Sequence, residues 1–153
     1  MIDGLTGISH RMAFHQQMEV ALLAKTRLLV IIADIDGRKA VNDSFGHEFG
    51  NDVLCMVAHA FAKRFGTRCC RFGGEQFAAF CECSDWAQGL ILTTTIEAEV
   101  ANLSFEERAG FAVAISVGTA TFPDEASTVN DLLRCADDSV YHGRRERRTR
   151  PTN

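Results

Sequence analysis

Acidic side chains stand at two points of the sequence where a rigid backbone is expected. Asp34 and Asp36 directly follow an apolar run, residues 28–33, which predicts a central strand covered on both faces. Glu75 follows a Gly-Gly pair that predicts the turn of a hairpin. Carboxylates that converge from two such elements suit Mg²⁺, which takes one or two protein carboxylates and completes its shell with water and phosphate. The pattern therefore indicates a divalent-cation site that stabilises charge on a phosphate-bearing substrate.

A second interpretation is that Asp34 and Asp36 only cap the helix expected after them, and spacing alone leaves both interpretations open. Basic residues bear on the same choice. Lys39 and a cluster of arginines near the end of the chain would contact phosphate in the first interpretation, whereas the cluster is simply a solvated end in the second. These arginines are Arg144, Arg145, Arg147, Arg148 and Arg150.

Composition is that of one ordinary globular domain. The chain has 153 residues, of which 46% are hydrophobic and 24% charged, so a disordered or collagen-like chain is excluded. The net charge of −4 argues against nucleic acid as a partner. Neither a membrane-spanning apolar run nor a signal peptide is evident, so we expect a soluble, cytoplasmic domain without membrane contact.

The cysteines show no metal-binding or redox pattern. No C-x-x-C pair and no zinc-ligand spacing with histidine occurs. We expect free thiols that pack as small apolar residues, without disulfides. They are Cys55, Cys69, Cys70, Cys81, Cys83 and Cys135.

Helical and strand patterns alternate along the chain, with one hairpin between them. We expect a first helix capped by Ser9 that runs to about Lys25. Further helices are expected over about residues 39–45, 51–65, 85–102 and 129–145, and strands over residues 28–33, 69–72, 77–81 and 111–121. Because the hairpin interrupts the alternation, the sheet should be mixed.

Several segments, in order along nearly the whole chain, resemble the motifs of one family. Residues 34–50, DIDGRKAVNDSFGHEFG, resemble the D-x-D-x-F-K-x-x-N-D-x-x-G-H-x-x-G segment of GGDEF domains. Residues 71–77, RFGGEQF, resemble the signature hairpin of that family, and residues 3–7 resemble its opening D-x-L-T-G. Residues 116–118 and 136–141 resemble its closing strand and helix.

The resemblance implies a single α/β (α+β) domain over residues 1–153, cut from a longer multidomain signalling protein. Its fold would be similar to nucleotidyl cyclases and the polymerase palm: a central mixed, mostly antiparallel sheet of about five strands flanked by helices. The implied activity is that of a diguanylate cyclase, in which two domains pair head to head, hold one GTP each with Mg²⁺ or Mn²⁺, and form cyclic di-GMP.

The resemblance also implies roles for individual residues. Asp34 and Glu75 would be catalytic metal ligands, helped by the Ile35 carbonyl, and Gln76 would stand at a further catalytic position. Lys39 would contact the terminal phosphate, Asn42 the guanine, and Arg144 and Arg148 further phosphate oxygens. The nucleotide-binding set is Arg38, Lys39, Asn42, His47, Asn51, Gly73, Gly74, Arg144 and Arg148.

The chain departs from the family pattern where function should suffer. Gln76 replaces a Glu and loses its charge, which we expect to cost about 10²–10³ in rate unless Glu75 alone suffices. Asn51 replaces the Asp that accepts from guanine, so a relaxed purine preference is expected. Thr67 replaces the acid of the inhibitory R-x-x-D motif, which should leave Arg64 without its orienting partner and weaken feedback. Arg38 replaces a Phe and is either a phosphate contact or solvated.

These departures favour a GGDEF-family domain of cyclic di-GMP signalling that is a weak or catalytically impaired cyclase and acts as a nucleotide-sensing or dimerising regulatory module. An active cyclase that uses two Mg²⁺ ions is the alternative. A third interpretation is a pure interaction module with an empty site. The expected partners are GTP or a related purine nucleotide, and a second copy or another GGDEF or EAL-type domain.

Overall fold

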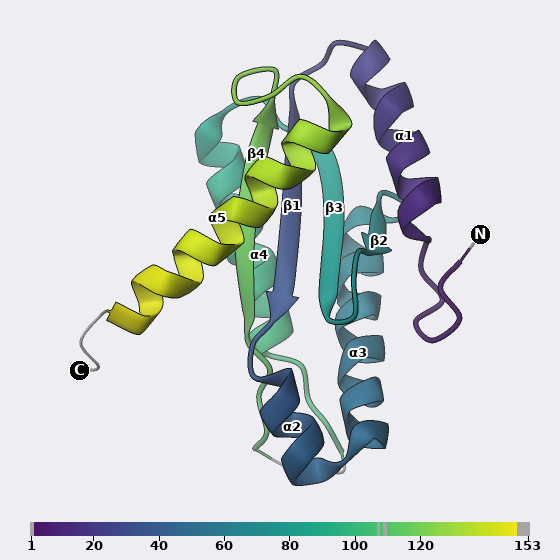
Figure 1. Cartoon of the computed structure of the whole chain (residues 1–153), viewed down its shortest axis with the longest axis vertical. Coiled ribbons are helices and arrows are strands. Elements are labelled where there is room, and N and C mark those ends of the chain that lie inside the picture. Colours follow the sequence, from purple (N-terminus) through teal and green to yellow (C-terminus); the bar gives the residue numbers. More distant parts are fainter. Residues whose placement is uncertain (1, 107, 109, 150–153) are drawn as a thin grey trace.

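The computed structural model describes residues 2–106, 108 and 110–149, with the backbone alone for Arg38 and residues 142–149. In chain order the elements are α1 (Arg11–Leu23), β1 (Leu28–Ile35), α2 (Arg38–Phe45), α3 (His47–Phe65), β2 (Cys69–Arg71), β3 (Gln76–Glu82), α4 (Trp86–Ala101), β4 (Ile115–Phe122) and α5 (Val129–Thr149). Figure 1 shows the sheet with α5 crossing one face and α3 and α4 behind the other. None of these described helices combines the length and apolar character needed to cross a bilayer.

The sheet is antiparallel, with the strand order β2-β3-β1-β4. The predicted α+β class is confirmed, but the described residues form four strands where about five were expected, and no parallel strand pair. The only parallel pairing among them is an isolated bridge from Ser9 to Cys70. The fourth strand begins at Ile115 rather than 111, because Phe111 packs edge-on against the rings of Phe49 and Phe105.

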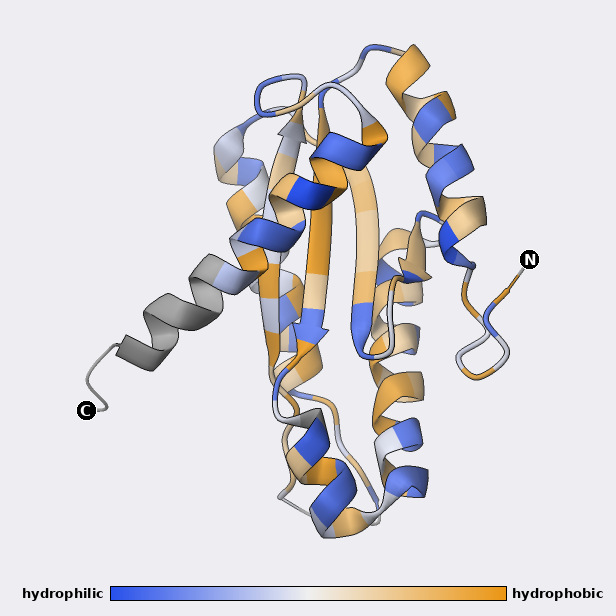
Figure 2. Ribbon diagram, in the orientation of Figure 1, coloured by the Kyte–Doolittle hydropathy of each residue, from blue (hydrophilic) through white to orange (hydrophobic). Residues whose placement is uncertain are grey.

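Alternation along β1 divides the core into two layers. Leu29, Ile31 and Ala33 pack with α3 and α4, whereas Val30 and Ile32 pack with α1 and α5. By the same alternation Asp34 belongs to the face that α1 and α5 cover. Figure 2 shows β1 and β3 apolar along most of their length and hydrophilic at the end nearest α2.

A glycine sets the position of α5 over the sheet. A Cβ on Gly118 would lie 2.1 Å from the Ala136 carbonyl oxygen and 2.3 Å from the Val140 nitrogen. The backbone of α5 therefore rests directly on β4 at this point, and any larger residue would displace the helix.

Two predicted helix starts are wrong by a few residues. The N-cap of α1 is His10 rather than Ser9, because Ser9 is used in backbone bridges to Ile2 and Cys70. Helix α3 begins at His47 rather than 51, since Gly46, at φ 90°, takes up the whole turn between α2 and α3.

All six cysteines are free thiols, as predicted. Burial raises the pKa of Cys69 to about 11 and that of Cys70 to about 12. These thiols remain protonated at neutral pH and pack as apolar side chains.

Candidate functional site

The sheet brings the two acidic points together. Asp34, near the end of β1, pairs directly with Gln76, the first residue of β3. The Ile35 N–H donates to the Glu75 carbonyl oxygen at 3.1 Å. Asp34 on β1 and Glu75 in the turn directly before β3 therefore lie at the same end of the sheet, whereas convergence of their carboxylates on a cation stays a prediction.

Asp36 has a structural contact with the start of β4. The Ser116 hydroxyl donates to Asp36 Oδ1 at 2.6 Å, which joins the end of β1 to the start of β4. Helix α2 begins after Gly37, whose φ is 70°, and has no side-chain cap. The N-cap position of α2 is thus a glycine, and a role of the aspartates in capping stays untested.

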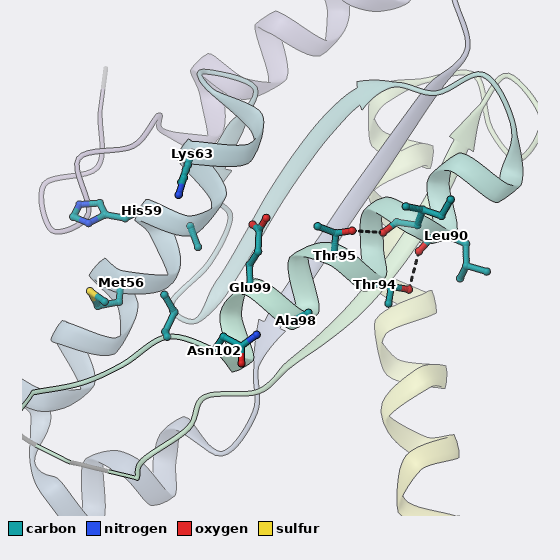
Figure 3. Close-up of a pocket in the computed structure, with 12 residues that line it drawn as sticks. Met56, His59, Lys63, Leu90, Thr94, Thr95, Ala98, Glu99 and Asn102 are labelled. Carbon is teal, nitrogen blue, oxygen red and sulfur yellow. Dashed lines mark hydrogen bonds between the residues drawn. The ribbon is translucent and has the colours of Figure 1, made fainter.

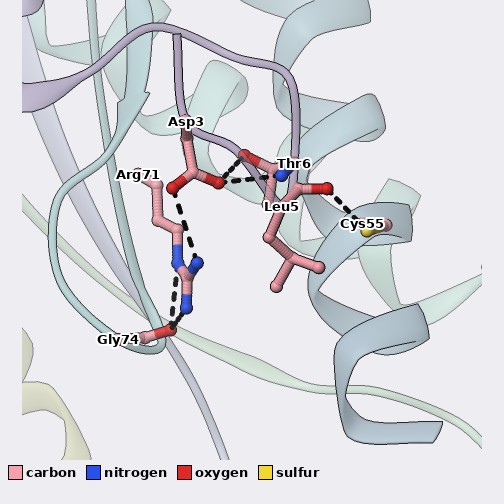
Figure 4. Close-up of polar contacts among 6 residues, drawn as sticks. All are labelled: Asp3, Leu5, Thr6, Cys55, Arg71 and Gly74. Atoms are coloured by element: carbon pink, nitrogen blue, oxygen red, sulfur yellow. Dashed lines mark hydrogen bonds and ion pairs between the residues drawn. The ribbon is translucent and has the colours of Figure 1, made fainter. Parts of the chain in front are cut away.

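The hairpin that carries Glu75 is held by Arg71. Its guanidinium donates to the Gly74 carbonyl from Nε at 3.2 Å and from Nη2 at 2.7 Å, and Nη1 lies 3.6 Å from Asp3 Oδ1. Figure 4 shows this guanidinium between the opening turn of the chain and the hairpin. Hydrogen bonds from Thr6 and the charge of Arg71 outweigh partial burial and lower the pKa of Asp3.

The Asp3–Arg71 contact was not predicted from the sequence, although the opposite charges of these two motif residues could have indicated it. The hairpin predicted at the Gly-Gly pair is present and joins the antiparallel strands β2 and β3. Neither Gly73 nor Gly74 adopts a positive φ. Gly73 leaves room instead for Gln76, whose Oε1 lies 3.0 Å from the place where a Cβ on Gly73 would be.

Helices α2 and α3 present the other candidate residues beside this end of the sheet. Lys39 is exposed on the first turn of α2, and His47 and Asn51 are exposed one helical turn apart on α3. Asn42 Oδ1 is buried without a hydrogen-bond partner among the described residues. It lies against Gly50, where a Cβ would be only 1.8 Å away. Asn42 thus presents an acceptor that a bound donor would satisfy.

The remaining candidate residues are the arginines expected to contact phosphate and the two residues at the predicted inhibitory motif. The side chains of Arg38, Arg144 and Arg148 lie outside the described part of the structure. Arg64 forms an ion pair with Glu99 of α4 in place of the motif acid that Thr67 replaces, and the weakened feedback stays a prediction. Thr67 is exposed in the turn after α3.

A cavity lies apart from this end of the sheet. A groove of about 940 Å³ runs between α3 and α4, and none of the predicted catalytic or nucleotide-binding residues lines it. Figure 3 shows Met56, His59 and Lys63 on one wall and Leu90 and Thr94 on the other. Leu90 and Ile91 both line this groove and are exposed.

Comparison with known proteins decides the family. The family described as "Diguanylate cyclase, GGDEF domain" matches residues 1–150. The chain belongs to the GGDEF family. The GGDEF chain is 30% identical to the diguanylate cyclase DgcM of Escherichia coli K12 over 97% of its length and 37% of that protein. It is also 30% identical to the response regulator PleD of Caulobacter vibrioides, over 93% of this chain and 33% of PleD. The chain thus spans about a third of the length of these relatives.

Solved structures agree on the GGDEF fold. A sensory box/GGDEF family protein from Caulobacter crescentus superimposes with a TM-score of 0.86 at 25% identity, covering 95% of this chain and 98% of that chain. The GGDEF domain of DgcB from Caulobacter crescentus, solved in complex with c-di-GMP, gives 0.81 at 26% identity, over 95% of this chain and 88% of that chain.

Proposed function

We propose that this GGDEF domain binds GTP, or a related purine nucleotide, together with Mg²⁺ or Mn²⁺ at the Asp34–Glu75 end of the sheet. It acts in cyclic di-GMP signalling in the cytoplasm as a weak or impaired cyclase whose main role is regulatory. The observation that carries this proposal is the pairing of β1 with β3, which sets Asp34 and Glu75 at one end of adjacent strands.

The donor set suits a hard divalent cation. Asp34 and Glu75 would hold it through carboxylate oxygens, and the Ile35 carbonyl would add a third oxygen. No group of three or more His, Cys, Asp or Glu side chains in the described residues is arranged to hold a metal by itself. The cation is therefore expected to bind as a complex with the nucleotide, whose phosphate oxygens complete its shell, and it would neutralise charge on the phosphates.

The chain's own side chains would orient the nucleotide. Lys39, on the first turn of α2, reaches the terminal phosphate, and Asn42 Oδ1 accepts from an N–H of the base. Asn51 offers an amide in place of a carboxylate, so a donor on the base meets a donor on the protein. We therefore expect GTP to bind less than about tenfold more tightly than ATP, since a mismatched donor costs about 1–3 kcal/mol.

Catalysis is expected to be weak because Gln76 supplies no charge. Removing one preorganised electrostatic contact typically costs about 10²–10³ in rate. A second copy of the domain, or another GGDEF or EAL-type domain, is the expected partner. An active cyclase is the second candidate, favoured by the hairpin that Arg71 holds and by the retained Asp34 and Glu75.

Incubation of the purified protein with GTP and Mg²⁺ or Mn²⁺, followed by chromatography, separates the two candidates. The proposal predicts a GTP-dependent rise in melting temperature with little or no cyclic di-GMP, because any ligand of the folded state stabilises it. Turnover near one per second would establish the active cyclase instead. The absence of a thermal shift with both GTP and ATP would contradict nucleotide binding.

A further inference from the structure

Gln76 is held between the hairpin and the last helix. Its Nε2 donates to Asp137 Oδ1 of α5 at 3.4 Å, and its Oε1 lies over Gly73. Asp137 is in reach because it follows Ala136, the residue at which α5 rests on Gly118 of β4. The amide thus joins the hairpin to α5 on the same face of the sheet as Asp34.

The chemistry of this contact depends on Gln76 being an amide. An amide carries two N–H donors, whereas an ionised carboxylate only accepts. A Glu at position 76 would set a second carboxylate opposite Asp137 at a similar distance, and two carboxylates so close repel unless a proton or a cation lies between them. In this chain the amide N–H occupies that place.

We propose that the hydrogen bond between Gln76 and Asp137 forms a latch that takes the place of a second divalent cation, so that the site holds one divalent cation per nucleotide. Asp137 is then a positioning residue, which fixes Gln76 and through it the hairpin that carries Glu75. The cation count rests on the proposed function, whereas the latch itself rests only on the hydrogen bond between the hairpin and α5.

The latch predicts an effect that needs no ligand. In EDTA, Gln76→Glu should lower the midpoint of thermal unfolding by about 2–4 °C, the scale for losing one interaction in a domain of this size. Adding Asp137→Asn to that variant should restore the midpoint, because a donor again faces a carboxylate. Asp138→Asn, a neighbouring exposed substitution on α5, is the matched control and should restore nothing.

The cation count is measured separately. Electron paramagnetic resonance titration with Mn²⁺ and a non-hydrolysable GTP analogue should give one bound Mn²⁺ per chain in the wild type. Gln76→Glu should raise this to two, and Gln76→Glu with Asp137→Asn should fall back toward one. A merely structural role for Asp137 would not change the count.

The outcomes separate this inference from the proposed function. Additivity of Gln76→Glu and Asp137→Asn in EDTA would overturn the latch, because interacting groups are non-additive. Two Mn²⁺ ions in the wild type would overturn the count while supporting nucleotide binding. No bound Mn²⁺ in the wild type would overturn both the proposed function and the count, and coupling in EDTA would still support the latch.

Discussion

The polar end of the sheet presents carboxylates, whereas the groove between α3 and α4 exposes apolar side chains. The first gathers Asp34 from β1 and Glu75 and Gln76 from the hairpin between β2 and β3. The second is a groove of about 940 Å³ that is lined in part by the exposed side chains of Leu90 and Ile91. The carboxylates favour the end of the sheet as the ligand site, because a fold positions charged groups rigidly where strands end.

The largest effect that sharpens this contrast is the loss of ligand binding at the sheet. Asp34→Asn or Glu75→Gln should weaken binding of Mn²⁺ with a GTP analogue by about 100-fold or more, because each removes a carboxylate from the cation. Isothermal titration calorimetry measures the change. Unaltered affinity in both variants would place the nucleotide elsewhere.

A smaller effect tests how α5 is positioned over the site. Gly118→Ala should destabilise the fold by about 1–3 kcal/mol and weaken nucleotide binding, because the new methyl group meets the α5 backbone. Urea unfolding measures the loss of stability. Gly4→Ala is the matched control, since a Cβ there meets nothing within 4 Å. Equal stability of the two variants would refute the close approach of α5 to β4.

The next smaller effect is expected from substituting Arg71, which holds the hairpin. Arg71→Lys keeps the positive charge near Asp3 but loses the paired hydrogen bonds to the Gly74 carbonyl, so unfolding should become easier by about 1 kcal/mol. Arg134→Lys, whose parent side chain is 71% exposed and pairs with Asp131, should change stability by less than about 0.5 kcal/mol. Denaturant titrations that gave the same loss for both would show that Arg71 does not hold the hairpin.

The smallest expected effect is in the groove. Leu90→Gln replaces a side chain that is 55% exposed, so we expect a stability change within about 0.5 kcal/mol and unchanged nucleotide affinity. The same calorimetry and urea unfolding check both values. A fall in nucleotide affinity comparable to that of Asp34→Asn would erase the distinction between the two regions.

Much of the fold was predictable, because periodicity alone located the helices and strands to within a few residues. The position of β1 was predicted from its apolar run, and the meeting of residues 34 and 75 from the hairpin turn together with the resemblance to GGDEF domains. The partners of Arg64 and Gln76 could not be predicted, since Glu99 and Asp137 lie on helices far along the chain. Such contacts depend on where α4 and α5 cross the sheet, which local sequence does not specify. The groove was missed for the same reason.

The most direct test of the account is a crystal structure of the protein with a non-hydrolysable GTP analogue and Mn²⁺. We predict an anomalous Mn²⁺ peak between Asp34 and Glu75, with the phosphates extending toward Lys39. A nucleotide in the groove between α3 and α4, or bound nucleotide without Mn²⁺ at the end of the sheet, would contradict it.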